Sequence, residues 1–344
     1  MNSLQISLLI AGGVTLLVVV LYNQWVSRRS TPRQADLPLN PAQQAAEMGS
    51  ASAPADPVVD DDFRNLPQPA SRTAIHALID AVAIVEVDQP VSGDAALAAM
   101  PSTRRVGTKP FHVEGCSELS GAWEPLSPGR RYSAFQAGVQ LANRMGPLNE
   151  IEFSEFVIKT QAFADAVGGS PNFTDMLVEV ARARELDQFA SAHDAQLSFT
   201  LQARAAAWSP GYIQQHAARL GFVAGVIPGR MVLPSSVAGL PPLLSLTFDT
   251  QAAMADDPTL SAIRECVLSL DVPQVPSSEA PYERLQQAVE LLAEQMDGDI
   301  TDGSGQILGI EVMRQIGYDI QHLYEALAQR KLDAGSPQAR RLFS

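Results

Sequence analysis

The chain has 344 residues, 46% of them hydrophobic, and carries a formal net charge of -14. This excess of acidic residues disfavours a phosphate-binding surface, because affinity for nucleic acid comes largely from clustered lysine and arginine. We therefore expect no nucleic-acid partner, and the length fits one large or two ordinary domains.

The N-terminal segment is apolar. Residues 4–26 contain no charged side chain, and a helix of that length would span the roughly 30 Å hydrocarbon layer of a membrane. Arg28, Arg29 and Arg33 follow this stretch, whereas no basic residue precedes it. By the positive-inside rule, we expect a retained transmembrane anchor within residues 1–29, with the rest of the chain in the cytoplasm.

The next segment, residues 30–71, is rich in proline, alanine, glutamine and serine and has no sustained apolar period. Such a composition cannot bury enough apolar surface to offset the loss of chain entropy on folding. The sequence therefore predicts a disordered linker here.

A first α+β unit is predicted for residues 72–194. It starts with a strand-like run, a small polar turn and an alanine-rich helix, continues with extended segments and closes with a helix that begins at a proline. The strands are expected to start near Ala81, Gly107, Phe135 and Glu155, and the closing helix at Pro171.

The same order of elements returns in residues 195–335, starting near Leu197 and including a helix that begins at Pro281. Residues 336–344 are predicted as a tail. The fold class is thus α+β: a single N-terminal transmembrane helix, a disordered linker and a split β-α-β antiparallel sheet covered by helices. The repeated order suggests a duplication.

Three strands of the second unit alternate between apolar and small polar residues, as expected for a sheet with one buried face. The residues predicted to face the helices are Leu197, Phe199, Leu201, Leu244, Leu246, Phe248, Cys266, Leu268 and Leu270. The residues predicted on the other, open face are Ser198, Thr200, Ser245, Thr247, Val267 and Ser269.

No set of residues indicates catalysis. The five histidines are scattered, with no pair or neighbouring carboxylate at metal-ligand spacing. We therefore expect no enzyme activity, no catalytic residues, no metal site and no cofactor.

Four short motifs follow one another within residues 195–332: "LGF" at 220–222, "LLSL" at 243–246, "VLSLDVP" at 267–273 and the closing "ILGIEVMRQIGYDIQHLYEAL". With these motifs, and with the predicted anchor and linker, the chain resembles the ZipA family of bacterial cell-division proteins. Members of that family are anchored in the inner membrane and bind the C-terminal tail of the tubulin-like FtsZ on the open face of their sheet.

The resemblance implies a membrane-tethered adaptor that links FtsZ filaments to the bacterial inner membrane during division. The anchor would contact the membrane through residues 4–26, with the N-terminus periplasmic and the C-terminal domains cytoplasmic. The alternative is a structural inner-membrane protein that binds another envelope or division protein and not FtsZ.

The resemblance also implies the residues of the tail-binding groove. Carried onto this sequence, they are Ser198, Thr200, Ile227, Thr247, Val267 and Ser269. Most of these are serine or threonine, where the family has larger apolar side chains. Because less apolar surface is available for burial, we expect weaker binding or a different peptide.

Overall fold

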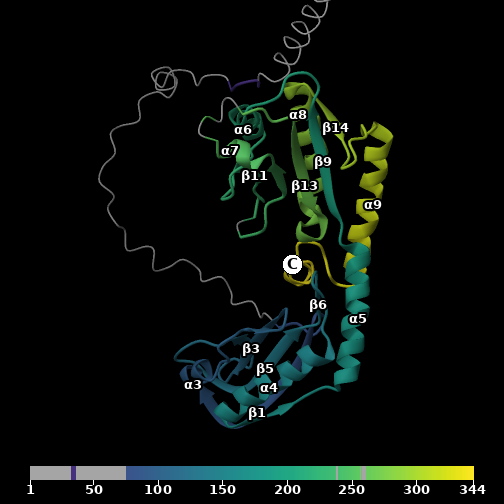
Figure 1. Ribbon diagram of the computed structural model, residues 1–344. Coiled ribbons are helices and arrows are strands. Elements are labelled where there is room, and N and C mark those ends of the chain that lie inside the picture. The colour runs from purple at the N-terminus through teal and green to yellow at the C-terminus, as the bar shows by residue number, and fades with distance from the viewer. Residues whose placement is uncertain (1–31, 36–74, 238, 256, 258–260) are drawn as a thin grey trace, which may run out of the picture. The chain divides into compact units, whose positions relative to one another are not determined.

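The computed structural model describes residues 32–35, 75–237, 239–255, 257 and 261–344. These residues form two compact units. The first unit contains residues 75–194 together with 336–344, and the C-terminal unit contains residues 195–335 together with 32–35. Both units are α+β, with antiparallel sheets and covering helices (Figure 1).

The first unit is built on an antiparallel sheet with the strand order β2-β3-β5-β1-β8, in which β4 pairs with β3. The strands are β1 (Asp80–Ser92), β2 (Arg105–Val106), β3 (Lys109–Ser117), β4 (Trp123–Pro125), β5 (Arg131–Gln140) and β8 (Gly169–Asn172). A short hairpin, β6 (Ala142–Asn143) and β7 (Gly146–Pro147), follows β5. The helices are α3 (Gly93–Ala98), α4 (Glu150–Val167) and α5 (Met176–His193).

Helix α4 covers one face of this sheet through phenylalanines. Phe156 lies 6.1 Å from Phe111 of β3, and Phe163 lies 5.3 Å from Phe135 of β5, measured between ring centroids. Such edge-to-face pairs add to the stabilisation from buried area. The core of the first unit therefore lies between α4 and the sheet.

Two predictions for the first unit were wrong. The segment at Glu155 belongs to α4 and is not a strand, because Asn149 and Glu152 form a capping box that starts a helix. Pro171 lies in β8, and α5 begins only at Met176, where the Asp175 side chain accepts hydrogen bonds from the first free backbone amides.

The predicted tail packs as part of the first unit. Helix α10 (Pro337–Leu342) places the guanidinium of Arg341 on the carboxylate of Asp80, with nitrogen-to-oxygen distances of 2.6 and 3.0 Å. Leu342 and Phe343 are each only 1% exposed. The last residues of the chain thus complete a unit whose other residues precede them by well over a hundred positions.

The C-terminal unit is a six-stranded antiparallel sheet with the order β10-β11-β12-β13-β9-β14. Its strands are β9 (Gln196–Ala203), β10 (Val223–Ala224), β11 (Arg230–Leu233), β12 (Leu244–Thr247), β13 (Glu265–Asp271) and β14 (Gly298–Thr301). Its helices are α6 (Pro210–Arg219), α7 (Thr250–Ala253), α8 (Pro281–Met296) and α9 (Ile310–Gln329). Figure 1 shows α8 alongside β9 and β13.

The apolar stripe of α8 explains this packing. Leu285, Val289, Leu292 and Met296 recur at helical spacing and are all fully buried. They share one core with Phe199 and with the other alternating apolar residues of the strands. Pro281 lies in the first turn of α8, as the sequence predicts.

The two sheets follow the same path. In the first unit β1 lies between β5 and β8, and in the C-terminal unit β9 lies between β13 and β14. A short helix follows β1 and β9, namely α3 and α6. A longer helix precedes the last strand of each unit, namely α4 before β8 and α8 before β14, and another follows it, namely α5 and α9. This correspondence is the arrangement that the suggested duplication implies.

The prediction of a membrane-spanning helix requires correction. The segment concerned, residues 4–26, lies outside the described residues. Among the helices that the structure describes, none is both long and apolar enough to cross a membrane. The longest, the 20-residue α9, carries Glu311, Arg314, Asp319 and Glu325. The corrected fold class of the described residues is α+β with antiparallel sheets and covering helices, without the predicted transmembrane helix. No described helix supports the predicted inner-membrane localisation.

Candidate functional site

The open face of the C-terminal unit is the face of its sheet opposite α8. The strand register brings the predicted groove residues together there in two rows. In one row Val267 of β13 pairs with Thr247 of β12 on one side and with Thr200 of β9 on the other. In the other row Ser269 lies between Ser245 and Ser198. Five of the six predicted residues are therefore side by side on three adjacent strands.

The alternation also gives these residues their exposure. Thr200, Thr247, Val267 and Ser269 are half-buried and Ser198 is exposed. Of the nine side chains predicted to face the helices, eight are buried and Leu197 is half-buried. Successive side chains of a strand point to opposite faces, so burial of one set leaves the other set accessible.

Ile227, the sixth predicted residue, belongs to neither row. It lies in the turn between β10 and β11, where its carbonyl oxygen accepts a hydrogen bond from the amide of Arg230 at 3.1 Å. Its side chain is 53% exposed. Ile227 is thus an accessible turn residue at the edge of the sheet.

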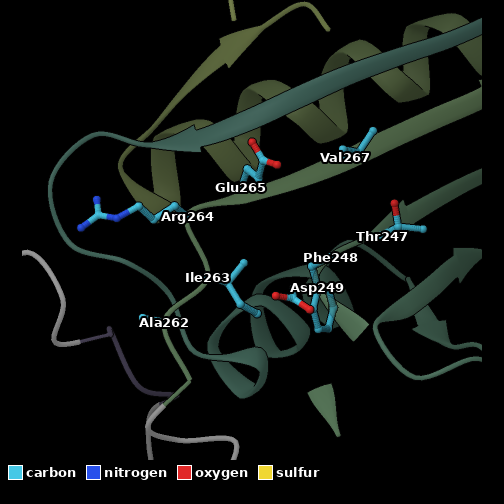
Figure 2. A pocket seen from close by; sticks show the side chains of 8 residues that line it. All are labelled: Thr247, Phe248, Asp249, Ala262, Ile263, Arg264, Glu265 and Val267. Carbon is cyan, nitrogen blue, oxygen red and sulfur yellow. The ribbon is translucent and has the colours of Figure 1, made fainter. Parts of the chain in front are cut away.

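A hollow of about 390 Å³ adjoins the row that contains Val267. Figure 2 shows Glu265 and Val267 on β13 and Thr247 on the neighbouring strand. The residues that line the hollow are Thr247, Phe248, Asp249, Ala262, Ile263, Arg264, Glu265 and Val267. None of these eight is a histidine, cysteine or lysine; the polar groups of the lining are the hydroxyl of Thr247, the carboxylates of Asp249 and Glu265 and the guanidinium of Arg264.

The lining is apolar at its base and charged at its rim. Phe248 and Ile263 are nearly buried, at 7% and 3% exposure. Arg264, Glu265 and Asp249 are exposed and carry charges of both signs. Such a site suits one apolar side chain of a peptide, with charged or polar neighbours at the rim.

The base of the hollow is held by backbone hydrogen bonds. The amide of Trp208 donates to the carbonyl of Ile263 at 2.7 Å, and the amide of Ile263 donates back at 2.9 Å. Trp208 is fully buried. This wall of the hollow is therefore fixed before any ligand binds.

Several residues of this face were missed from the sequence. Arg230 pairs with Thr247, and Gln202 pairs with Glu265. The alternation alone would have extended the open face to Gln202 and Glu265. Arg230 becomes part of the face only through the pairing of β11 with β12, which depends on tertiary structure.

Ser245 also changes the expected site. Its hydroxyl oxygen lies 2.8 Å from that of Ser269, so the two hydroxyls share a hydrogen bond across the strands. A hydroxyl already paired in this way has less to gain from a ligand. Val267 and the two threonines beside it are then the residues of the face best placed to contact a partner.

The corresponding face of the first unit is partly filled by the chain itself. The side chain of Ile75 lies so close to Gly138 of β5 that a Cβ there would be 2.9 Å from Cγ2 of Ile75. The buried Glu114 accepts hydrogen bonds from the amide of Ile75 at 3.2 Å and from Gln136 at 2.8 Å. Of the two related faces, the one in the C-terminal unit is the more accessible at its centre.

Comparison with known proteins adds no assignment: no protein-family model and no curated protein matches this chain.

Proposed function

We propose that the protein is a non-enzymatic adaptor in cell division that binds the C-terminal tail of FtsZ on the open face of its C-terminal unit. The observation that carries this proposal is the row formed by Thr247, Val267 and Thr200, which continues into a hollow with an apolar base. The choice of FtsZ as partner follows from the sequence resemblance to the ZipA family.

The chemistry of this face favours a peptide over a small polar ligand. An apolar side chain entering the hollow would contact Val267 and the small exposed surface of Phe248 and Ile263, and each Å² of apolar surface removed from water contributes about 25 cal/mol. The neighbouring threonines and the paired serines contribute little apolar area. A single tail should therefore bind weakly, with avidity from many tails on one filament adding to the attachment.

The test is a titration of a fluorescently labelled FtsZ tail peptide with the full chain, followed by anisotropy. Val267→Glu places a charge in a contact that loses water on binding, which should cost about 2 kcal/mol, or roughly 30-fold in affinity. The free protein should fold normally, because Val267 is half-buried on the open face.

Val312→Glu serves as the matched control, because it makes the same chemical change on α9, where Val312 is 49% exposed. It should leave tail affinity unchanged. Equal affinities for the wild type and Val267→Glu, with equal melting curves, would exclude this face as the site. A wild-type chain that does not bind the tail would exclude FtsZ as the partner and favour a different division or envelope protein.

A further inference from the structure

The C-terminal unit holds a second peptide-like contact, made by residues 32–35 of the same chain. The amide of Arg33 donates to the carbonyl of Ala207 at 2.6 Å, and the carbonyl of Arg33 accepts from the amide of Ser209 at 2.9 Å. Together these two hydrogen bonds form a parallel β-bridge between Arg33 and Trp208. Figure 1 shows this short purple segment near α6.

The side chain of Arg33 reaches the C-terminal end of α8. Its Nη1 donates to the carbonyl of Met296 at 3.0 Å, and its Nη2 donates to the carboxylate of Asp297 at 2.8 Å. The last carbonyls of a helix have no partner within the helix and carry its negative dipole end, so a cation is stabilised there. A guanidinium can serve a carbonyl and a carboxylate together because its donors form a planar fork.

The surroundings of this contact belong to the folded core. The indole Nε1 of Trp208 donates to the same Met296 carbonyl at 2.9 Å, and Trp208 is fully buried. Beyond Arg33, Ala35 lies against the first turn of α6. Its Cβ is 3.7 Å from the point where a Cβ would lie if Gly211 had a side chain. The backbone edge, the helix end and the carboxylate are therefore held in place by packing that does not involve residues 32–35.

We propose that these groups form a binding site for an extended peptide segment that carries an arginine, and that residues 32–35 occupy it in cis. The backbone of Ala207 to Ser209 recognises the extended chain, while Met296 and Asp297 select arginine. The site differs from the open face in its residues and in its ligand. It does touch the base of the hollow, since Trp208 pairs with Ile263.

An occupant in cis should exclude the same segment added in trans, because a tethered segment binds without the entropic cost of bringing in a second molecule. Removing the arginine from the chain should open the site to a free peptide. The probe is the labelled octapeptide STPRQADL, which has the sequence of residues 30–37. The protein is the full chain, and binding is followed by anisotropy.

Arg33→Ala should bind the octapeptide at least 10-fold more tightly than the wild type does. An octapeptide with alanine in place of its arginine should bind neither protein. Adding Asp297→Asn to Arg33→Ala should lower octapeptide affinity at least 10-fold. Asn suits this position, because Asp297 has a φ of 58°, which asparagine tolerates well. Melting curves check that each variant is folded.

Hydrogen exchange of the two bridging amides gives a second readout in the same proteins. The amides of Arg33 and Ser209 should be protected in the wild type and exchange at least 10-fold faster when residue 33 is alanine. Any of four results would overturn the proposal. The octapeptide could bind both proteins equally, could bind equally well with alanine in place of its arginine, or could fail to bind Arg33→Ala; or the two amides could be unprotected in the wild type. The FtsZ tail titration reports on Val267 and is independent of these results.

Discussion

Replacing Arg341 by alanine should destabilise the first unit, because it leaves the carboxylate of Asp80 buried without its counter-ion. Asp80 is 1% exposed and accepts two hydrogen bonds from Arg341. Its remaining hydrogen bond comes from the amide of His76 at 2.8 Å. One backbone donor cannot replace a bidentate guanidinium.

Removing one partner of a buried ion pair costs about 3–5 kcal/mol. The Arg341 side chain retains 22% exposure, so water can partly replace it, and we expect the lower end, about 3 kcal/mol. The free energy of unfolding of a domain is typically about 5–15 kcal/mol, so the first unit should lose a large part of its stability. Amides that exchange through global unfolding should then exchange about 100-fold faster.

Hydrogen exchange with mass spectrometry can separate the two units, since peptides from β1, β3 and β5 report on the first unit and those from β9, β12 and β13 on the other. Arg131→Ala is the control, because its pair with Glu118 is exposed at the surface and should contribute under about 1 kcal/mol. Adding Asp80→Asn to Arg341→Ala should recover part of the loss, since the amide is neutral. Wild-type exchange in the first unit of Arg341→Ala would refute the reasoning.

Two further predictions concern packing and thiol chemistry. Gly138→Ala should displace the side chain of Ile75 from β5 and lower the free energy of unfolding of the first unit, measured in urea, by about 1–3 kcal/mol. Adding Ile75→Ala should recover part of that loss. An unchanged urea midpoint for Gly138→Ala would show that the site accommodates a methyl group. Burial raises the pKa of the Cys266 thiol to about 12. Iodoacetamide at pH 8 should therefore modify the half-buried Cys116 and leave Cys266 unmodified in the folded protein. Equal labelling of the two cysteines in a peptide map would contradict this.

The sequence determined which side chains of the C-terminal sheet are buried. Alternation between residues such as Phe199 and Thr200 requires only the two-residue repeat of a strand, so burial of one set fixes the face of the other. The start of α8 at Pro281 was equally accessible, because a proline in the first turn is a local signal.

Short apolar runs were harder to interpret. The segment around Glu155 is as apolar as a strand, and only the capping box at Asn149 with the phenylalanine spacing identifies it as α4. Periodicity alone cannot separate a buried strand from a buried helix over a few residues. The order of elements in the first unit therefore came out differently from the prediction.

Contacts between distant parts of the chain were decided only by the tertiary structure. Arg341 and Asp80 are 261 positions apart, and Arg33 and Asp297 are 264 positions apart. Nothing near either arginine in the sequence identifies its partner. An arginine binds wherever folding brings a carboxylate and free carbonyls within reach, and that depends on how the sheets and helices pack around it.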